Sequence, residues 1–470
     1  MNSRREFIQN TLLASVACGA ATEAVAQKSA VKEPSTNANP LIYPMRPTKA
    51  QLSRELTVAI VGAGGRGWGY QRYGKRFPGT MKVVAVADLL PFRRERMAKA
   101  WNIPAERCFC DYRELLAASA KGKLADILMV TLPDHLHYDA TMKGMDLGYD
   151  VLVEKPMAQS SKECLDMLAK QKETGRIVGV CHVLRYAPYF EAMKSAIDRG
   201  LIGQIMSVQH TELVDMIHTS HSYVRGNWRN SKIATPMVIS KCCHDLDLIN
   251  WFIGARCTHA SAEGEQRYFI PKNRPVGAPA RCTDGCPHEK DCIYSALKTY
   301  VRQRRWTAPL DLPPKATDEQ VAKILAESPY SRCVFACDND QPEQYAAALR
   351  FENGVSVAFS YEALSRVGQR RTRIIGTKGM LEGGGIGFRL TDLATGKFWD
   401  WSMKIQDIPG YESQGHGGGD FRLVRDFLMA VDRHDPSMLT SSLEASVESH
   451  LIGFACEESR LTGKKVKIHG

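Results

Sequence analysis

A histidine and a carboxylate with the spacing needed for acid–base chemistry lie in an apolar segment near the middle of the chain. His244 and Asp247 are three residues apart, so on a helix both side chains lie on one face, where the carboxylate can orient the imidazole. An imidazole with the ordinary pKa of ~6.5 can accept a hydroxyl proton near neutral pH. Taken alone, such a histidine is more often a core residue, so its role depends on the surrounding motifs.

A second candidate for chemistry is Lys155, in the tripeptide Glu154-Lys155-Pro156. The tripeptide directly follows residues 150–153, whose last three residues are apolar, as is typical of a buried strand. In sheets of parallel strands, ligands bind at the carboxyl ends of the strands. An ammonium group placed there can hold a substrate oxygen and stabilise the negative charge that develops on it.

A phosphate-binding turn lies near the start of the fold. The run 57–61 predicts a strand and leads into a G-x-G-x-x-G turn made by Gly62, Ala63, Gly64, Gly65, Arg66 and Gly67. The glycines allow a tight turn and close approach of the backbone to a pyrophosphate, and the next helix starts with free N–H groups. A second strand-like run, 82–87, ends in Asp88, whose carboxylate can bind both ribose hydroxyls and repels a 2′-phosphate. The pattern predicts NAD, and the nearby Arg93 and Arg94 keep NADP as the less favoured alternative.

The elements that position these residues change in type along the chain. Strand-like runs at 126–131, 150–153 and 177–180 alternate with helix-like runs at 137–147 and 161–174, which predicts a doubly wound Rossmann domain over 53–180. Further on, a strand at 206–212 is followed by hairpin patterns at 346–361, 373–382 and 389–399. We therefore expect an α/β fold in which residues 181–470 form a second α/β domain with a large, mainly antiparallel open sheet.

Two motifs indicate a family resemblance. Glu154-Lys155-Pro156, with Leu132-Pro133-Asp134-His135-Leu136-His137 upstream, resembles the Gfo/Idh/MocA family of sugar and cyclitol oxidoreductases. The resemblance covers essentially everything from about Leu56 onward. It implies that Lys155 contacts both the nicotinamide ribose and the substrate. It also implies that Pro133, His137 and Glu154 join the glycine turn and Asp88 in binding the cofactor.

The resemblance also gives His244 a role. Family members usually carry D-x-G-x-H-x-x-D, whose histidine is the proton acceptor, and residues 240–247 here read SKCCHDLD. His244 and Asp247 match this motif, whereas Ser240 and Cys242 replace the first aspartate and the glycine. We expect His244 to be the base, oriented by Asp247, and Lys241 to contact the substrate in place of the missing aspartate.

Two segments rich in polar and aromatic residues are candidate carbohydrate contacts. Residues 221–229 include Tyr223, Trp228 and Arg229, and residues 415–420 include His416. Binding residues are often carried by loops on a rigid scaffold, but either segment could equally be an ordinary loop. In the family the open sheet commonly mediates oligomer contacts, which implies a homo-oligomer, either a dimer or a tetramer.

Five of the 14 cysteines form two clusters in a predicted insertion at about 257–340. The segment is rich in Pro, Gly and charged residues, so we expect it to need a staple. The spacing differs from the C-x2-C of common zinc sites, and both a structural zinc and disulfides stay open, with an iron–sulfur cluster less favoured. The clustered residues are Cys282, Cys286, Cys292, Cys333 and Cys337. Cys242 and Cys243, beside His244, are interpreted as buried packing rather than as a nucleophile.

The first 26 residues have the features of an export signal. Arg4 and Arg5 precede Phe7 and a short apolar stretch that ends in the A-x-A cleavage pattern at 24–26. This arrangement resembles a twin-arginine (Tat) signal, the route for proteins exported already folded. We expect a signal at 1–26, a flexible linker at 27–52, and a periplasmic or otherwise exported protein that carries tightly bound NAD with it.

The charge pattern excludes some partners. The net charge of +11 is spread along the chain, and basic runs such as 302–305 lack the interleaved aromatic residues that nucleic-acid binding favours. The apolar stretch of the signal is too short for stable membrane insertion. The expected partner is a small carbohydrate, with no nucleic acid.

Together the motifs predict an exported NAD-dependent oxidoreductase that acts on a hydroxyl or keto group of a sugar, glycoside or cyclitol. Two alternatives stay open. An NAD-dependent glycosidase, similar to α-N-acetylgalactosaminidases, would oxidise the sugar transiently and eliminate the aglycone, but the tyrosine and glycines that flank the histidine in those enzymes are absent here. A non-catalytic protein would hold NAD as a structural element and bind sugar.

Overall fold

The computed structural model describes residues 39–313 and 315–469. The predicted Tat signal at 1–26 and the first part of the predicted linker lie outside the described residues. The later part of that linker is packed against the fold, because Leu41 and Met45 are buried in a hydrophobic core. Arg46 also forms an ion pair with Asp426, at 2.8 Å.

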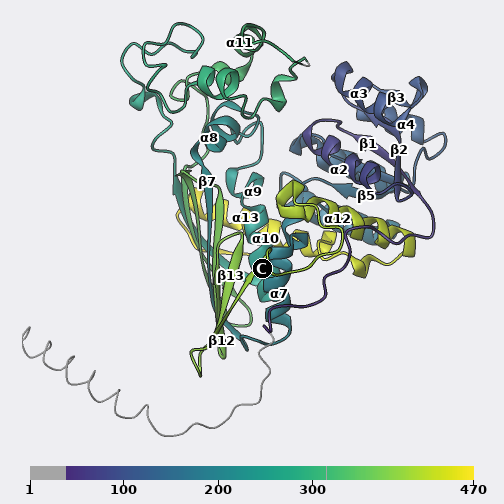
Figure 1. Cartoon of the computed structure of the whole chain (residues 1–470), viewed down its shortest axis with the longest axis vertical. Coiled ribbons are helices and arrows are strands. Elements are labelled where there is room, and N and C mark those ends of the chain that lie inside the picture. Colours follow the sequence, from purple (N-terminus) through teal and green to yellow (C-terminus); the bar gives the residue numbers. More distant parts are fainter. Residues whose placement is uncertain (1–38, 314, 470) are drawn as a thin grey trace, which may run out of the picture. The chain divides into compact units, whose positions relative to one another are not determined.

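The predicted Rossmann sheet is present, with six parallel strands in the order β3-β2-β1-β4-β5-β6 (Figure 1). The strands are β1 (Leu56–Val61), β2 (Met81–Ala87), β3 (Cys108–Phe109), β4 (Ile127–Val130), β5 (Asp150–Val153) and β6 (Val178–Val180). The connecting helices are α2 (Gly65–Arg76), α3 (Pro91–Trp101), α4 (Tyr112–Ser119), α5 (His137–Asp146) and α6 (Ser161–Thr174). The strand order reverses between β1 and β4, and this is where ligands bind in such sheets.

Helices from the end of the chain complete the core of this sheet. Phe421 and Phe427 of α12 (Gln414–Arg433) pack in one core cluster with Val58 and Ile60 of β1. In a second cluster, residues of α13 (Leu443–Thr462) pack with β4 and β5. The start of α12 is thereby held close to the glycine turn.

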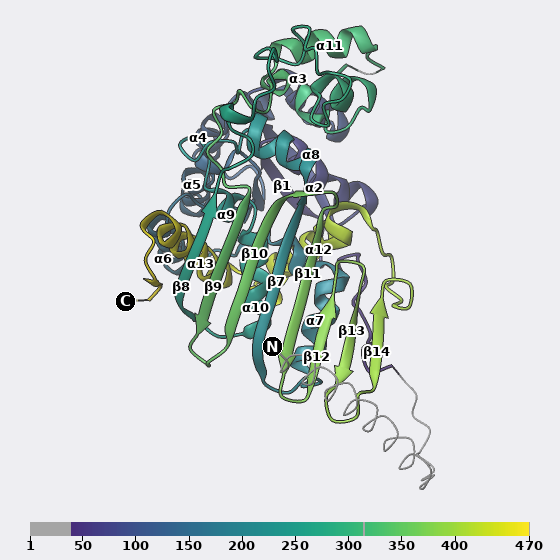
Figure 2. The ribbon, with the colours of Figure 1, turned by 90° about the vertical axis from the view of Figure 1, so that its left-hand side faces the viewer.

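The second sheet has nine strands in the order β14-β13-β12-β11-β7-β10-β9-β8-β15 (Figure 2). Neighbouring strands pair antiparallel except β7 and β10, which are parallel. This confirms the predicted fold class, with a mainly antiparallel sheet in the C-terminal part. The strands are β7 (Ile205–Asp215), β8 (Cys257–Glu265), β9 (Gln344–Phe351), β10 (Ser356–Ser365), β11 (Gln369–Gly376), β12 (Gly379–Gly383), β13 (Gly387–Asp392), β14 (Phe398–Ser402) and β15 (Val466–Lys467).

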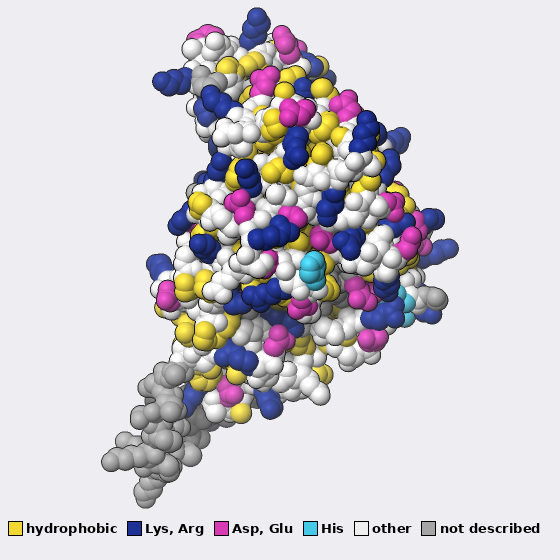
Figure 3. All heavy atoms as spheres, turned by 90° about the vertical axis from the view of Figure 1, so that its right-hand side faces the viewer, with side chains coloured by type: hydrophobic (Ala, Val, Ile, Leu, Met, Phe, Trp, Pro, Cys, Tyr) yellow, Lys and Arg dark blue, Asp and Glu magenta, His cyan; other side chains and the backbone are white. Residues whose placement is uncertain are grey.

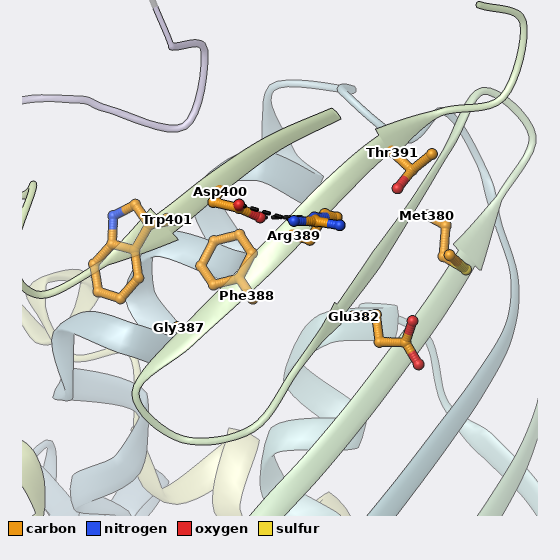
Figure 4. Close-up of a pocket in the computed structure, with 8 residues that line it drawn as sticks. All are labelled: Met380, Glu382, Gly387, Phe388, Arg389, Thr391, Asp400 and Trp401. Carbon is orange, nitrogen blue, oxygen red and sulfur yellow. Dashed lines mark hydrogen bonds and ion pairs between the residues drawn. The ribbon is translucent and has the colours of Figure 1, made fainter. Parts of the chain in front are cut away.

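One face of the nine-stranded sheet is buried and the other is open. Along β9 exposed and buried side chains alternate strictly, as expected for a sheet covered on one side. Helices α7 (Pro188–Asp198) and α10 (Cys243–Ile253) cover the buried face (Figure 2). The open face has a shallow hollow over β12–β14 (Figure 4), lined by Met380, Glu382, Gly387, Phe388, Arg389, Thr391, Asp400 and Trp401. Arg389 and Asp400 pair within this hollow, which contains none of the predicted catalytic residues.

The insertion between β8 and β9 has its own apolar packing. One core cluster joins Tyr300, Val321 and Leu325, the last two from α11 (Asp318–Glu327). Another includes Phe269, Tyr294 and Phe335. The expectation that this segment has little apolar core of its own is therefore wrong.

The two cysteine clusters lie together in space, as the stapling readings require. Cys282, Cys286, Cys292 and Cys333 line one small apolar cavity, and all five clustered residues, Cys337 included, are free thiols. Across residues 39–313 and 315–469, no group of three or more His, Cys, Asp or Glu side chains could hold a metal ion. The structure thus does not support the predicted zinc.

The surface carries mixed charge. On the side with the Rossmann sheet, acidic and basic side chains are interspersed (Figure 3). None of the helices within the described part of the chain is both long and apolar enough to span a bilayer.

Candidate active site

The glycine turn has the geometry of a phosphate cradle. Gly62 has a φ of 93°, and a Cβ there would lie 2.4 Å from the carbonyl oxygen of Thr131. A Cβ on Gly67 would lie 2.2 Å from the carbonyl oxygen of Gly62, whereas Gly65 faces open space. Helix α2 starts at Gly65 with no side-chain cap and no acidic residue in its first turn. Its free N–H groups and positive dipole end therefore suit a pyrophosphate.

Asp88 ends β2 beside this turn. Its carboxylate accepts hydrogen bonds from the backbone N–H of Ala63, at 2.7 Å, and of Leu90, at 2.9 Å. The side chain is 9% exposed, so the carboxylate is available at the edge of the turn. Arg94 donates to the backbone oxygen of Asp88, and Arg93 pairs with Asp311, so both arginines already have acidic or carbonyl partners. The residues fit a dinucleotide with free ribose hydroxyls.

Arg66 connects the glycine turn to the predicted catalytic segments. Its guanidinium donates to Glu154, at 2.5 Å, and to Asp420 of α12, at 2.8 Å. The hydroxyl of Tyr70 also donates to Glu154, at 2.7 Å. Burial alone would raise the pKa of Glu154, but the charge of Arg66 and its hydrogen bond outweigh that effect and lower it. Arg66 and Glu154 are thus partners in a buried network that fixes the loops around the cofactor site.

Lys155 and Lys241 approach the same stretch of backbone. Lys155 Nζ donates to the carbonyl oxygen of Ser240, at 2.7 Å, at the end of α9 (Met237–Ser240). Lys241 Nζ pairs with Glu212 of β7, at 3.0 Å, and Glu212 also pairs with Arg370 of β11. Lys155, which follows the carboxyl end of β5, therefore contacts the backbone shortly before His244, whereas the side chain of Lys241 is paired with the sheet strand β7.

His244 is buried at the start of α10 and is 5% exposed. Its Nδ1 has no hydrogen-bond partner among the described residues, and neither does the nearby Oγ of Ser240. Buried polar atoms without partners are rare and indicate a site completed by a ligand or water. Burial lowers the pKa of His244 well below its ordinary value, and the charge of Lys155 adds to this effect. The imidazole is therefore neutral at pH 7 and able to accept a proton.

Asp247 does not orient His244, and this expectation is corrected. The helix places both residues as predicted, but the carboxylate of Asp247 accepts two hydrogen bonds from Arg185, both at 2.7 Å. His182 lies between the two groups, with its ring centroid 5.8 Å from that of His244. A buried arginine provides two donors that match a carboxylate, and this pairing outcompetes the neutral imidazole.

His416 faces His244 from a strained loop. Their ring centroids are 5.9 Å apart, and His416 Nδ1 lies 2.8 Å from Asp420 Oδ1. Four consecutive residues, Gly415 to Gly418, have φ between 48° and 88°, which is costly for the non-glycine His416. Burial would raise the pKa of Asp420, but its hydrogen bond from His416 and the charge of Arg66 keep that pKa well below the usual range.

Of the two remaining predicted cofactor contacts, one lies at the ligand edge of the sheet and the other holds loops together. Pro133 is exposed where β4 ends, at the ligand edge of the sheet. The His137 ring instead lies within hydrogen-bond distance of the carbonyl oxygens of Pro156 and Leu132. Because both ring nitrogens contact backbone, His137 joins two loops rather than facing a cofactor.

The segment 221–229 is mostly structural. Tyr223 is buried, whereas Trp228 is 39% exposed. Arg229 pairs with Asp338 at the base of the insertion, at 2.7 Å, and is directed away from a substrate role.

Sequence reasoning missed several residues around His244. His182 follows the carboxyl end of β6 by two residues, and the rule that ligands bind at that edge could have found it. Glu212 and Arg370 lie on sheet strands with no local motif. The fold and this site define a dinucleotide-dependent oxidoreductase with a buried, neutral histidine beside a lysine.

Comparison with known proteins agrees with this class. The model of the oxidoreductase family with an NAD-binding Rossmann fold matches residues 56–182, and that of the family's C-terminal alpha/beta domain matches residues 194–468. The chain belongs to the Gfo/Idh/MocA oxidoreductase family.

Similar sequences include YteT of Bacillus subtilis, named as an oxidoreductase, at 25% identity over 70% of this chain and 78% of YteT. The inositol 2-dehydrogenase/D-chiro-inositol 3-dehydrogenase of Lactiplantibacillus plantarum is 24% identical over 42% of this chain and 52% of that protein. The match thus spans about half the length of that dehydrogenase.

Solved structures share the fold. An inositol dehydrogenase homologue from Azotobacter vinelandii, complexed with NAD+, has a TM-score of 0.65 at 16% identity, over 90% of this chain and all of that one. A levoglucosan dehydrogenase, in complex with NADH and levoglucosan, has a TM-score of 0.64 at 16% identity, over 88% of this chain and all of that one.

Proposed function

We propose that the protein oxidises or reduces one carbon of a sugar, glycoside or cyclitol with NAD(H). Membership in an NAD-binding oxidoreductase family, with relatives named for inositol, supports the substrate class. The observation that carries the proposal is the juxtaposition of an unpartnered, neutral His244 with Lys155. Lys155 Nζ donates to the carbonyl oxygen of Ser240, four residues before His244, at 2.7 Å.

NAD bound through the glycine turn and Asp88 would serve as the hydride acceptor or donor, at its nicotinamide ring. His244 accepts the proton of the substrate hydroxyl through its unpaired nitrogen, because that group is held neutral. Lys155 holds the same substrate oxygen and stabilises its negative charge as the proton leaves. The reverse reduction uses the same groups in opposite protonation states.

The proposal includes export with the cofactor already bound. The pairing of Arg4 and Arg5 with Phe7 in a signal-like N-terminus supports transport after folding. Free NAD is expected to be scarce outside the cytoplasmic membrane, so slow release would be needed. The bound cofactor would then be restored in place by a second substrate, which gives ping-pong kinetics.

A direct test denatures dialysed protein and assays the supernatant for nucleotide. We expect NAD or NADH in near-stoichiometric amount, and sugars added to the native protein should change the absorbance of the bound nicotinamide. Protein that holds no nucleotide and binds added NAD only weakly would contradict retention. Protein that binds NAD but responds to none of the sugars or cyclitols would contradict the proposed reaction.

One observation favours a second function, transient oxidation followed by elimination of an aglycone. A ketone beside a ring carbon makes that carbon's proton acidic, and its removal by a second base forms a C=C bond while the glycosidic C–O bond breaks. His416, held by Asp420 at 2.8 Å and opposite His244, is a second base of the required kind.

The two functions differ in the role of His416. A glycoside supplied already as its keto form should release its aglycone without net change in NADH, and His416→Gln should slow that release ~10²-fold or more. The same variant should leave simple oxidation of a free sugar nearly intact. Equal losses in both assays would exclude a separate eliminating base.

A further inference from the structure

The insertion between β8 and β9 reaches from the substrate end of the site to the glycine turn. Two anchors fix the loop at residues 304–311, near the start of α11. Asp311 pairs with Arg93 of the Rossmann helix α3, at 3.0 Å. Trp306 stacks on His218 of α8 (Met216–Thr219), with ring centroids 4.5 Å apart.

The first anchor lies over the phosphate cradle. An atom at the Cβ position of Gly64 would lie only 3.2 Å from Nη1 of Arg93. Arg96, one turn further along α3, donates to the carbonyl oxygen of Ala63, at 3.2 Å. The insertion is therefore tied to the side chain that covers the glycine turn. The partners are 25% and 27% exposed, so solvent screens this ion pair only in part.

The second anchor lies on the helix that follows the strand carrying the partner of Lys241. Helix α8 follows directly on β7, which carries Glu212, the partner of Lys241. Burial lowers the pKa of His218 to about 3, and the charges of Lys241 and Lys155 contribute to that shift. Trp306 covers His218 from the insertion and remains 39% exposed. The loop thus packs on the helix that directly follows β7, the strand whose Glu212 pairs with Lys241.

The backbone between the anchors is held in an uncommon conformation. Trp306 has a φ of 56° and Asp311 a φ of 45°, and Arg304 is also left-handed, at 51°. Non-glycine residues adopt this region at a cost that the surrounding contacts must offset.

We propose that residues 304–311 form a clasp across the candidate cofactor site, covering a dinucleotide bound between the glycine turn and Lys155. This inference rests on the proposed use of NAD(H). It gives the insertion a role in retaining the bound nucleotide. Release of the nucleotide then requires the Arg93–Asp311 pair to open. The insertion thereby becomes part of the cofactor site, although its cysteines are not.

Asp311→Asn tests the clasp most cleanly. Asparagine tolerates the left-handed conformation, so this variant removes the charge while keeping the size and backbone of the loop. We expect NADH loaded into the protein to leave about 3- to 10-fold faster when chased with excess NAD+, followed by nicotinamide fluorescence. Asp400→Asn is the matched control, because Asp400 pairs with Arg389 on the open face of the nine-stranded sheet, outside the clasp. Its release rate should equal that of the wild type.

A double variant separates the ion pair from a direct effect of Arg93 on the nucleotide. Arg93→Gln/Asp311→Asn should release NADH no faster than Arg93→Gln alone, because both changes remove one interaction. An unchanged release rate in Asp311→Asn, or equal acceleration in Asp400→Asn, would overturn the clasp while leaving the proposed function intact. A wild-type protein that binds no NAD(H) would overturn both.

Discussion

The two ends of the candidate cofactor site are built in different ways. At the glycine turn, nearly every feature comes from one short stretch and one neighbouring strand, with Asp88 hydrogen bonded to the N–H of Ala63. At the catalytic end, the groups come from segments far apart in the chain, including Lys155, His244 and His416. The first end is formed by backbone shape. Around the second end, ion pairs between residues distant in the sequence, such as Arg66 with Asp420 and Arg185 with Asp247, hold the segments together. Local geometry can therefore be read from a motif, whereas the catalytic environment depends on the complete fold.

Removing a catalytic side chain should give the largest effect. His244→Ala and Lys155→Ala should each lower kcat by ~10²–10⁴-fold, the range for positioned acid–base and charge-stabilising groups. NAD binding at the other end of the site should survive, as measured by titration. If His244→Ala keeps near-full activity across the pH range, His244 is not the base, and Lys241 or His416 would be the next candidate.

Asp88→Ala tests the glycine-turn end. The variant removes a hydrogen-bond acceptor and a charge that repels a 2′-phosphate, so NAD should bind roughly 10- to 100-fold more weakly and NADP should gain relative to NAD. Titration of both cofactors gives the ratio, and Asp88→Asn isolates the contribution of charge. An unchanged NAD/NADP affinity ratio would refute the assignment.

The histidine cluster at the catalytic end should make stability depend on pH. His182, His244 and His450 are buried, burial lowers the pKa of each, and that of His450 falls to about 3. The unfolded chain binds protons near pH 6.5 that the folded protein does not, so the free energy of unfolding should fall as pH drops below ~6.5, approaching ~1.4 kcal/mol per pH unit for each histidine. Urea unfolding from pH 8 to 5 measures this.

His450→Gln provides the matched variant for that measurement. Its stability should depend less steeply on pH, because one buried group no longer titrates on unfolding. If the free energy of unfolding of the variant changes with pH as steeply as that of the wild type, groups other than His450 cause the loss of stability in acid. In the same pH series, the acid limb of the oxidation rate should lie below 6.5, since the lowered pKa keeps His244 neutral further into acid.

The elements whose patterns depend on neighbouring residues could be predicted from the sequence. The βαβ rhythm, the glycine turn and the hairpins of the second sheet predicted the fold, because each pattern is set by neighbouring residues. The position of Lys155 at the carboxyl end of β5 followed from the same logic.

Partner choice at the catalytic end could not be predicted. Spacing placed Asp247 on the same helix as His244, but only the fold brings Arg185 to it. Likewise, Asp420 and Arg66 are 354 positions apart in the chain, and no local pattern predicts their ion pair. The packing of the insertion could not be predicted either, because its apolar residues are scattered among polar ones and come together only in the folded protein.

The central claim is that the protein uses bound NAD(H) to change the oxidation state of a carbohydrate. The most direct measurement incubates purified holoprotein with a panel of sugars, glycosides and cyclitols and analyses the products by mass spectrometry. We expect at least one compound to lose or gain two hydrogens, and Lys155→Ala to abolish the change. A panel that returns unaltered, from protein shown to hold its nucleotide, would contradict the account.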